Sequence, residues 1–282
     1  MTKEVLRLRA EKLSALHNGP HALVLPNAWD CPGAVLFEKA GFPAIATTSG
    51  GVAATLGYSD HQYIPRDVML LMAGRIAASV GIPVTADLEA GYGRTPAEVA
   101  ETIRKAIQSG LAGANIEDTA DSKGGLVDLA YQVEVIKAIR QVATEEEVPL
   151  VLNARVDAFI HDLGGTEAQF REGVKRARAY REAGADCIFP IGLKQRDQVA
   201  AFVRELDCPV NVIVGPGTLS VAELEQLGIR RITFGTGLMR AVLPAVQRMA
   251  QEIKAKGWSG LLEQAAFTHD AVNGLFTKPG GM

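Results

Sequence analysis

The sequence contains few cysteines, and their spacing indicates neither a disulfide framework nor a metal cluster. The three are Cys31, Cys187 and Cys208, and no two of them stand at C-x-x-C spacing. An odd and scattered set of thiols argues against a disulfide-stabilised secreted domain and against a zinc site. We therefore expect a reducing compartment, and the cytoplasm is the default.

Long apolar runs and a strong charge of one sign are also absent. No run approaches the roughly 18 residues that a membrane helix needs, and the charged N-terminus lacks the apolar core of a signal peptide. The formal net charge is −3, without a block of Lys and Arg that would attract nucleic acid. We therefore expect neither a membrane nor a nucleic-acid partner.

Short apolar, β-rich runs alternate with amphipathic segments along almost the whole chain. Most of these runs are continuously apolar, as strands buried on both faces should be. There are about eight: Ala22–Pro26, Ala44–Thr48, Pro83–Asp87, Ala114–Glu117, Leu150–Arg155, Cys187–Pro190, Pro209–Val214 and Arg231–Phe234. The alternation predicts a parallel α/β sheet. Eight repeats, with no G-x-G-x-x-G after the first run, favour a closed (β/α)8 TIM barrel over a doubly wound sheet.

The barrel is predicted to occupy the chain as a single domain, residues 1–282. A helix from about Glu4 to His17, within about residues 1–20, precedes the first strand. An extra helical tail follows about Lys256 and covers about residues 257–282. The segment Thr166–Ala183 shows apolar residues at helical spacing and stops at Gly184.

Acidic side chains end three successive strand-like runs, at the edge where barrel enzymes carry their chemistry. Asp87 and Glu89 end the third run, Glu117 ends the fourth, and Arg155 and Asp157 end the fifth. Side chains two apart on a strand face the same way, so these groups would crowd one mouth. A hard divalent cation such as Mg²⁺ would relieve their repulsion, and Arg155 would offer a donor fork to a substrate carboxylate. The alternative is that the acids are helix caps and salt-bridge partners.

Three further features point to the binding of a small anion. Thr48, Ser49 and Gly50 follow the second run, where backbone N–H groups could grip the end of a 2-oxo acid; an ordinary Gly-rich turn is the alternative. Asp60 lies on the long loop that follows, which could act as a catalytic lid. Asn211 interrupts the seventh run, either facing the substrate or satisfied in the core.

Taken in order, these motifs resemble the isocitrate lyase and phosphoenolpyruvate mutase superfamily over nearly the full chain. The run D-x-[DE]-x-G-Y-G, followed by E-D and by A-R-x-[DE], is a specific signature. The matching segments are Pro26–Asp30, Ala46–Gly51, Leu56–Asp60, Asp87–Gly93, Asn115–Asp118 and Asn153–Asp157.

The resemblance implies a TIM barrel whose last helix is often exchanged between subunits of a homodimer or a dimer of dimers, and the tail after Lys256 suits such an exchange. It also implies Mg²⁺ or Mn²⁺. Asp87 matches the direct metal ligand of the family, and Glu89 and Glu117 match the carboxylates that reach the metal, usually through water.

The resemblance further implies a small 2-oxo acid substrate. Arg155 matches the arginine that binds the substrate carboxylate. Thr48, Ser49 and Gly50 match the positions that bind the 2-oxo acid end, and Asp60 matches the acid of the gating loop.

Two loops depart from the family patterns. The lyases carry K-[KR]-C-G-H after the fourth strand, whereas Thr119–Leu126 contains neither Cys nor His, and its Ser122 and Lys123 match the mutase loop only loosely. After the sixth strand, Phe189–Gly192 lacks the Glu of the lyases and the His of the mutases. The chain is thus closest to phosphonomutase-like and oxaloacetate decarboxylase-like members without the lyase Cys loop.

The sequence predicts a metal-dependent carbon–carbon lyase or decarboxylase that acts on a small 2-oxo or 2-hydroxy acid through an enolate. Its expected catalytic residues are Asp60, Glu117 and Arg155, with Asp60 or a water returning the proton. Three alternatives stay open: P–C bond chemistry on phosphonopyruvate, a Schiff-base aldolase using Lys194, and a 2-oxo acid binding protein without efficient turnover.

Overall fold

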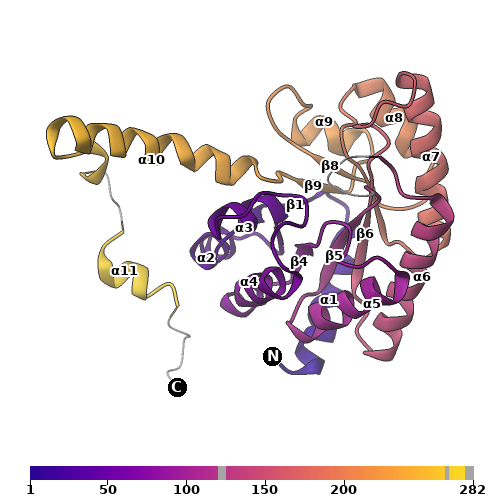
Figure 1. The fold of residues 1–282 in the computed structure, drawn as a ribbon, viewed down its shortest axis with the longest axis horizontal. Helices are drawn as coiled ribbons and strands as arrows, with labels where there is room; N and C mark the ends of the chain where they lie inside the picture. Colours follow the sequence, from indigo (N-terminus) through magenta and orange to yellow (C-terminus); the bar gives the residue numbers. More distant parts are fainter. Residues whose placement is uncertain (120–124, 264–266, 277–282) are drawn as a thin grey trace.

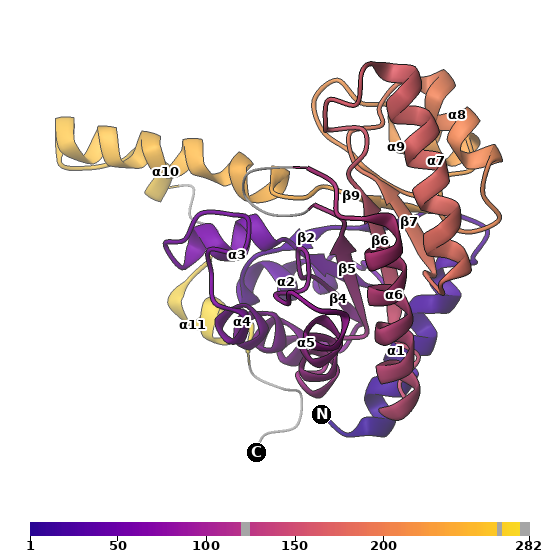
Figure 2. The same ribbon diagram turned by 45° about the vertical axis from the view of Figure 1, so that its right-hand side comes forward.

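The computed structural model describes residues 1–119, 125–263 and 267–276, and in it the strands form one closed parallel barrel (Figures 1 and 2). The strands are β1 Leu23–Leu25, β2 Asn27–Ala28, β3 Ile45–Thr47, β4 Val84–Asp87, β5 Gly113–Glu117, β6 Val151–Val156, β7 Cys187–Pro190, β8 Asn211–Ile213 and β9 Arg231–Thr233. Each of the eight predicted runs contains a strand, so the predicted segments are confirmed.

Barrel closure depends on the first strand, which is divided at Pro26 into β1 and β2. Proline has no N–H to donate to a ladder. β1 pairs with β9, whereas β2 pairs with β3. From there the order runs β3-β4-β5-β6-β7, and a bridge from Ile188 to Val210 links β7 to the segment entering β8. The predicted (β/α)8 barrel is therefore confirmed.

Most of the helices surround this barrel, and local sequence signals explain where they begin. They are α1 Lys3–His17, α2 Cys31–Lys39, α3 Ser49–Thr55, α4 Arg66–Ser79, α5 Pro96–Gln108, α6 Leu129–Glu145, α7 Thr166–Glu182, α8 Arg196–Arg204, α9 Val221–Gln226, α10 Gly237–Lys256, the 3-10 turn η1 Gly260–Leu262 and α11 His269–Asn273. Helix α5, for example, begins with a capping box in which Thr95 and Glu98 satisfy each other's backbone N–H groups.

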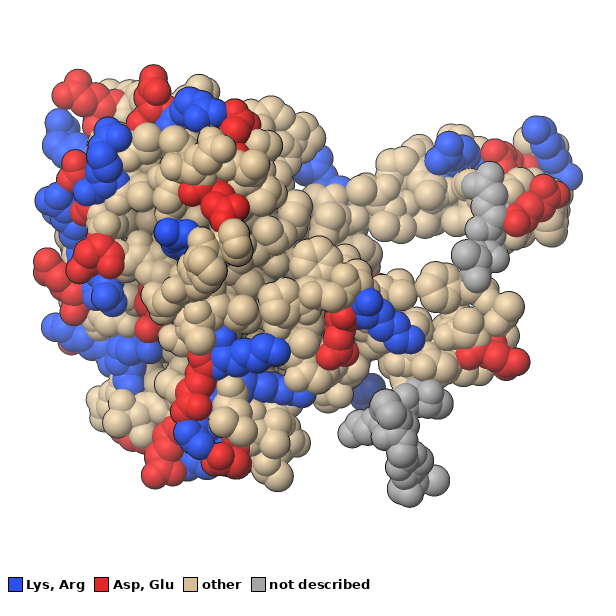
Figure 3. Space-filling model, turned by 180° about the vertical axis from the view of Figure 1, so that it is seen from behind, with Lys and Arg blue, Asp and Glu red and all other residues tan. Residues whose placement is uncertain are grey.

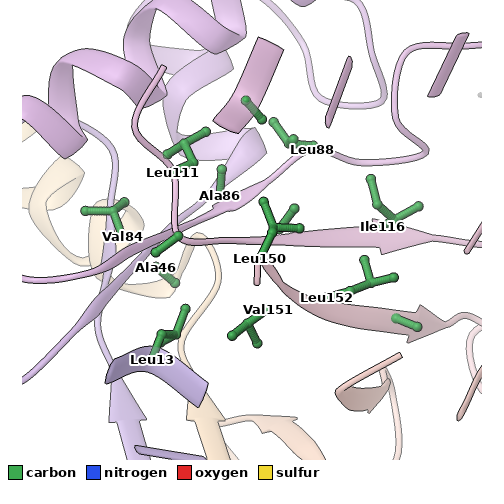
Figure 4. Close-up of a cluster of buried hydrophobic side chains, with 14 of the residues drawn as sticks. Leu13, Ala46, Val84, Ala86, Leu88, Leu111, Ile116, Leu150, Val151 and Leu152 are labelled. Carbon is green, nitrogen blue, oxygen red and sulfur yellow. The ribbon is translucent and has the colours of Figure 1, made fainter. Parts of the chain in front are cut away.

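Helix α1 closes the amino-terminal end of the barrel, which we call the floor. Its buried residues include Leu6, Ala10 and Leu13, and Figure 4 shows Leu13 near Val151 of β6 in the apolar interior. Gly113 is needed for this packing, because a Cβ there would come within 2.9 Å of Leu13 Cδ2. The predicted N-terminal helix thus forms part of the barrel core.

Helix α10 leaves the barrel and projects from it (Figure 1). No residue along it is buried, and apolar Val242, Leu243, Val246 and Ile253 are exposed. Figure 3 shows charged groups toward the far end of this helix and mostly uncharged surface along its middle. The chain therefore departs from the barrel at Gly237, earlier than the sequence suggested. No helix in the part of the chain that the structure describes is long and apolar enough to cross a membrane.

Candidate active site

A cavity of about 200 Å³ opens at the carboxyl ends of the strands, which we call the mouth of the barrel. Seven of the nine predicted site residues line it: Thr48, Ser49, Asp60, Asp87, Glu89, Glu117 and Arg155. The other two, Gly50 and Asn211, are not among its lining residues. The structure thus brings most of the predicted residues to one place.

Asp87 is held at the end of β4 by the start of α3. The backbone N–H of Ser49 donates to Asp87 Oδ2 at 3.1 Å, and the Ser49 hydroxyl donates to the same oxygen at 2.7 Å. The Asp87 N–H donates to Thr47 Oγ1 at 3.0 Å. Ser49, which was predicted to bind the substrate anion, therefore binds the carboxylate of Asp87 instead and orients it toward the cavity.

Glu89 is buried and lies on a strained backbone. Its φ of 53° and the φ of 57° at Tyr92 are left-handed values that non-glycine residues rarely adopt. The carboxylate accepts hydrogen bonds from the Tyr92 hydroxyl at 2.7 Å and from the Gln62 N–H at 2.5 Å. Burial raises the pKa of Glu89 to about 7 despite the Tyr92 hydrogen bond, and the neighbouring Asp87 and Asp60 add to the rise.

Arg155 is engaged by two carboxylates. Its Nε and Nη2 donate to the two oxygens of Asp157 at 2.6 and 3.0 Å, and its Nη1 lies 2.5 Å from Glu117 Oε2. Burial raises the pKa of Glu117, and the charge of Arg155 opposes this rise. The guanidinium is thus a fixed cation, and only its remaining N–H bonds can serve a substrate.

A buried polar network supports Arg155 from behind. Thr119 donates its hydroxyl to Asp157, and the Asp157 N–H donates to Asp118 Oδ1 at 2.8 Å. The other oxygen of Asp118 accepts from the Tyr180 hydroxyl at 2.7 Å and from Arg176 at 3.2 Å. Helix α7 therefore fixes the position of the guanidinium through two carboxylates.

Asp60 reaches the cavity from the loop after α3. Its Oδ1 is buried and has no hydrogen-bond partner among the described residues. Its Oδ2 lies so close to Gly50 that a Cβ at that position would be 2.8 Å away. The following residues His61 and Gln62 have positive φ angles of 72° and 58°. Gly50 therefore makes room for the Asp60 carboxylate.

The donor set fits a hard divalent cation. Among the described residues, Asp60, Asp87, Glu89 and Glu117 line the cavity with a single guanidinium, that of Arg155. Within the described ranges, no three His, Cys, Asp or Glu side chains form a group that could hold an ion. A cation here would need water or substrate oxygens as further ligands, which is how Mg²⁺ is usually bound.

Sequence reasoning missed several residues of the cavity, among them Asn27, His61, Asn115 and Thr233. Asn27 Oδ1 accepts from the N–H groups of residues 234 and 235, so it ties the first and last strands together. A polar residue within or directly after an apolar run was the available signal for the two asparagines.

The remaining candidates lie around or away from this cavity. Asn211 is buried and donates to Thr233 Oγ1 at 3.3 Å, one step behind the cavity wall. Lys194 is exposed and does not line the cavity. Ser122 and Lys123 lie outside the described residues.

A family model described as phosphoenolpyruvate phosphomutase matches residues 13–254. A protein of Mycobacterium tuberculosis, described only as uncharacterized, is 34% identical over 238 residues, which cover 84% of this chain and 87% of that protein. The 2-methylisocitrate lyase of Shewanella oneidensis is 30% identical over 236 residues, covering 79% of this chain and 78% of the enzyme.

Solved structures resemble the whole chain. A putative lyase/mutase from Burkholderia cenocepacia is 38% identical with a TM-score of 0.88, covering 98% of both chains. A 2,3-dimethylmalate lyase is 30% identical with a TM-score of 0.85, covering 95% of this chain and 94% of that enzyme.

Proposed function

The chain belongs to the phosphoenolpyruvate mutase and isocitrate lyase superfamily of lyases and mutases, and from that premise we propose that it is a Mg²⁺-dependent carbon–carbon lyase or decarboxylase of a small 2-oxo or 2-hydroxy acid. The observation that carries this proposal is the cavity of about 200 Å³ that four carboxylates line together with Arg155. Its size suits a substrate of a few carbon atoms.

The residues divide into those that would hold a cation and those that would hold the substrate. Asp87 would bind Mg²⁺ or Mn²⁺ directly, with Glu89 and Glu117 holding its waters. Such an ion supplies electrostatic stabilisation of the negative charge that develops on the substrate's 2-oxygen. The free N–H bonds of Arg155 would bind the C1 carboxylate, because the rest of the guanidinium is fixed by Asp157 and Glu117.

Decarboxylation of a 2-oxo diacid suits this chain, whose loop Thr119–Leu126 carries neither Cys nor His. The C3–C4 bond breaks, its electron pair forms the enolate, and CO₂ leaves without help from a base. A proton must then return to C3. Asp60, whose Oδ1 has no partner among the described residues, is placed to take up a proton from solvent and deliver it.

The test is pyruvate release from oxaloacetate, measured with Mg²⁺ and with excess EDTA. We expect saturable turnover that EDTA abolishes and that Asp87→Ala lowers at least about a hundredfold, since the cation supplies several kcal/mol. Free metal slowly decarboxylates oxaloacetate, so the variant is also the control. Equal turnover in the variant and the wild type would contradict the assigned ligand.

A P–C bond reaction is the second candidate, favoured by the match to the phosphoenolpyruvate phosphomutase model over residues 13–254. It would use the same enolate and the same cation site. Phosphate release from phosphonopyruvate, without pyruvate release from oxaloacetate, would select it. Affinity for 2-oxo acids without turnover of either would indicate a binding role.

We also propose that the chain forms a homodimer or homotetramer in which α10 packs on a second copy. Leu243 and Val246 are among its exposed apolar residues, and the described part of its own chain buries no residue of this helix. Light scattering should give a multiple of the 30.0 kDa chain mass. The double variant Leu243→Asp, Val246→Asp should reduce the mass toward that of one chain.

A further inference from the structure

Arg231 of β9 is a buried cation beneath the candidate site. By volume it is the largest of the fully buried side chains among the described residues, and its exposed fraction is 0%. Its Nη2 donates to Asn115 Oδ1 at 3.0 Å, its Nη1 lies 3.4 Å from His17 Nε2, and its Nε has no partner among the described residues. A buried charge held by neutral groups alone is costly.

The tautomer of His17 suits this contact. Its Nδ1 lies 2.7 Å from the Leu13 carbonyl oxygen, to which it can only donate, so Nε2 presents a lone pair to the guanidinium of Arg231. Burial lowers the pKa of His17 to about 4, and the charge of Arg231 contributes. At neutral pH the neutral His17 therefore faces one end of the Arg231 guanidinium as an acceptor, and the other end donates to Asn115.

Asn115 is oriented by its two donors. Its Oδ1 accepts from Arg231 Nη2 and from Asn153 Nδ2, the latter at 2.9 Å. A guanidinium can only donate hydrogen bonds, so a reversed amide would set N–H groups against N–H groups. No residue in the described ranges accepts a hydrogen bond from Asn115 Nδ2, and Asn115 lines the cavity. Its two N–H bonds are therefore available on the cavity side.

The geometry points to Arg231 as a positioning residue and to Asn115 as a substrate-binding residue, whose amide donates to an oxygen of a small carboxylic acid. Asn115 is the register partner of Asp87 on the adjacent strand, and it shares a face of β5 with Glu117. The amide thus lies beside the carboxylates assigned to the cation. This assignment rests on the proposed function and adds a hydrogen-bond donor to the lining of the cavity.

The choice of arginine has a physical reason. A neutral glutamine or asparagine at position 231 could donate or accept, so it would permit either orientation of the Asn115 amide. Arginine permits only one. Burial lowers the pKa of Arg231, while the charge of Asp87 favours its cationic form.

The test is calorimetric titration of oxalate, a small dicarboxylate, into the Mg²⁺-loaded protein. We expect Asn115→Ala to weaken binding roughly tenfold, or about 1.4 kcal/mol. Arg231→Met should weaken it to a similar extent, and the double variant should bind no worse than Asn115→Ala, because the two residues act as one unit. Arg231→Lys, which keeps a cationic donor, should recover part of the affinity.

The control is Arg140→Met, which removes a partly buried guanidinium (side chain 25% exposed) whose Nε has no partner among the described residues and which pairs with Asp186 outside the cavity. It should lower the melting temperature and leave oxalate affinity unchanged. Unchanged affinity in Asn115→Ala overturns the assignment of Asn115, and additive losses in the double variant overturn the positioning role. If the wild type does not bind oxalate, the proposed function fails together with this assignment. The Asn115→Ala result stands even where Arg231→Met does not fold.

Discussion

The mouth and the floor of the barrel are built on opposite principles. At the floor, α1 packs Leu6, Ala10 and Leu13 into the barrel, and the buried Arg231 faces His17 there, with Arg231 Nη1 3.4 Å from His17 Nε2. At the mouth, four carboxylates and the guanidinium of Arg155 line one cavity, and four of the five positive-φ non-glycine residues of the described chain lie nearby: His61, Gln62, Glu89 and Tyr92. The floor therefore contributes to the stability of the fold, whereas the mouth carries backbone strain and like charges that lower stability and serve the chemistry.

The largest effect should come from Asp60→Asn at the mouth. Loss of the group that returns the proton should lower kcat by about a hundredfold to ten-thousandfold. The melting temperature should hold or rise, because a buried carboxylate oxygen without a partner is neutralised. Pyruvate release and thermal melting measure the two effects.

The matched floor variant is Leu13→Ala. It should cost about 2–5 kcal/mol of unfolding free energy while activity per folded molecule is kept. If Asp60→Asn instead destabilised the protein and kept kcat, the contrast between mouth and floor would be wrong.

A smaller effect should appear in the pH dependence of stability, through His17 at the floor. Its pKa is about 4 in the folded chain and about 6.5 in the unfolded chain. Above pH 6.5 neither state binds the proton. As pH falls toward 4 the unfolded chain takes it up and the folded chain does not, so stability is lost, by up to about 3 kcal/mol.

The check is urea unfolding of the wild type and of His17→Gln between pH 7 and pH 4.5. Glutamine can replace both contacts without titrating, so the variant should lose less stability as pH falls. His21→Gln is the control, because the His21 side chain is 84% exposed. Parallel curves for the wild type and His17→Gln would show that His17 is not buried as a neutral group.

Much of the barrel and the convergence of the carboxylates could be predicted from the sequence, because both follow from local patterns. A buried parallel strand must be continuously apolar, and parallel strands end at the same edge. The pairing of Arg155 with both Asp157 and Glu117 could not be predicted, since it depends on side-chain distances. Nor could the contact of Asn115 with Arg231, 116 residues away.

The projection of α10 was missed for a related reason. An amphipathic pattern shows that a helix has an apolar face, but it does not show which surface covers that face. The sequence predicted an extra helical tail only after about Lys256, whereas the helix that leaves the barrel begins at Gly237 and ends at Lys256.

The smallest effect should be that of Gly50→Ala, which tests how closely the mouth is fitted. The added Cβ would lie 2.8 Å from Asp60 Oδ2 and 2.9 Å from Thr236 Cγ2. Because Asp60 lies on a loop, its carboxylate can shift by a few tenths of an ångström. We expect kcat to fall about tenfold, a barrier increase of about 1.4 kcal/mol, with little change in melting temperature. Gly237→Ala, where a Cβ meets nothing within 4 Å, is the control. An unchanged kcat in Gly50→Ala would mean that the position of Asp60 tolerates such a shift, and the mouth would then be less tightly organised than its backbone strain suggests.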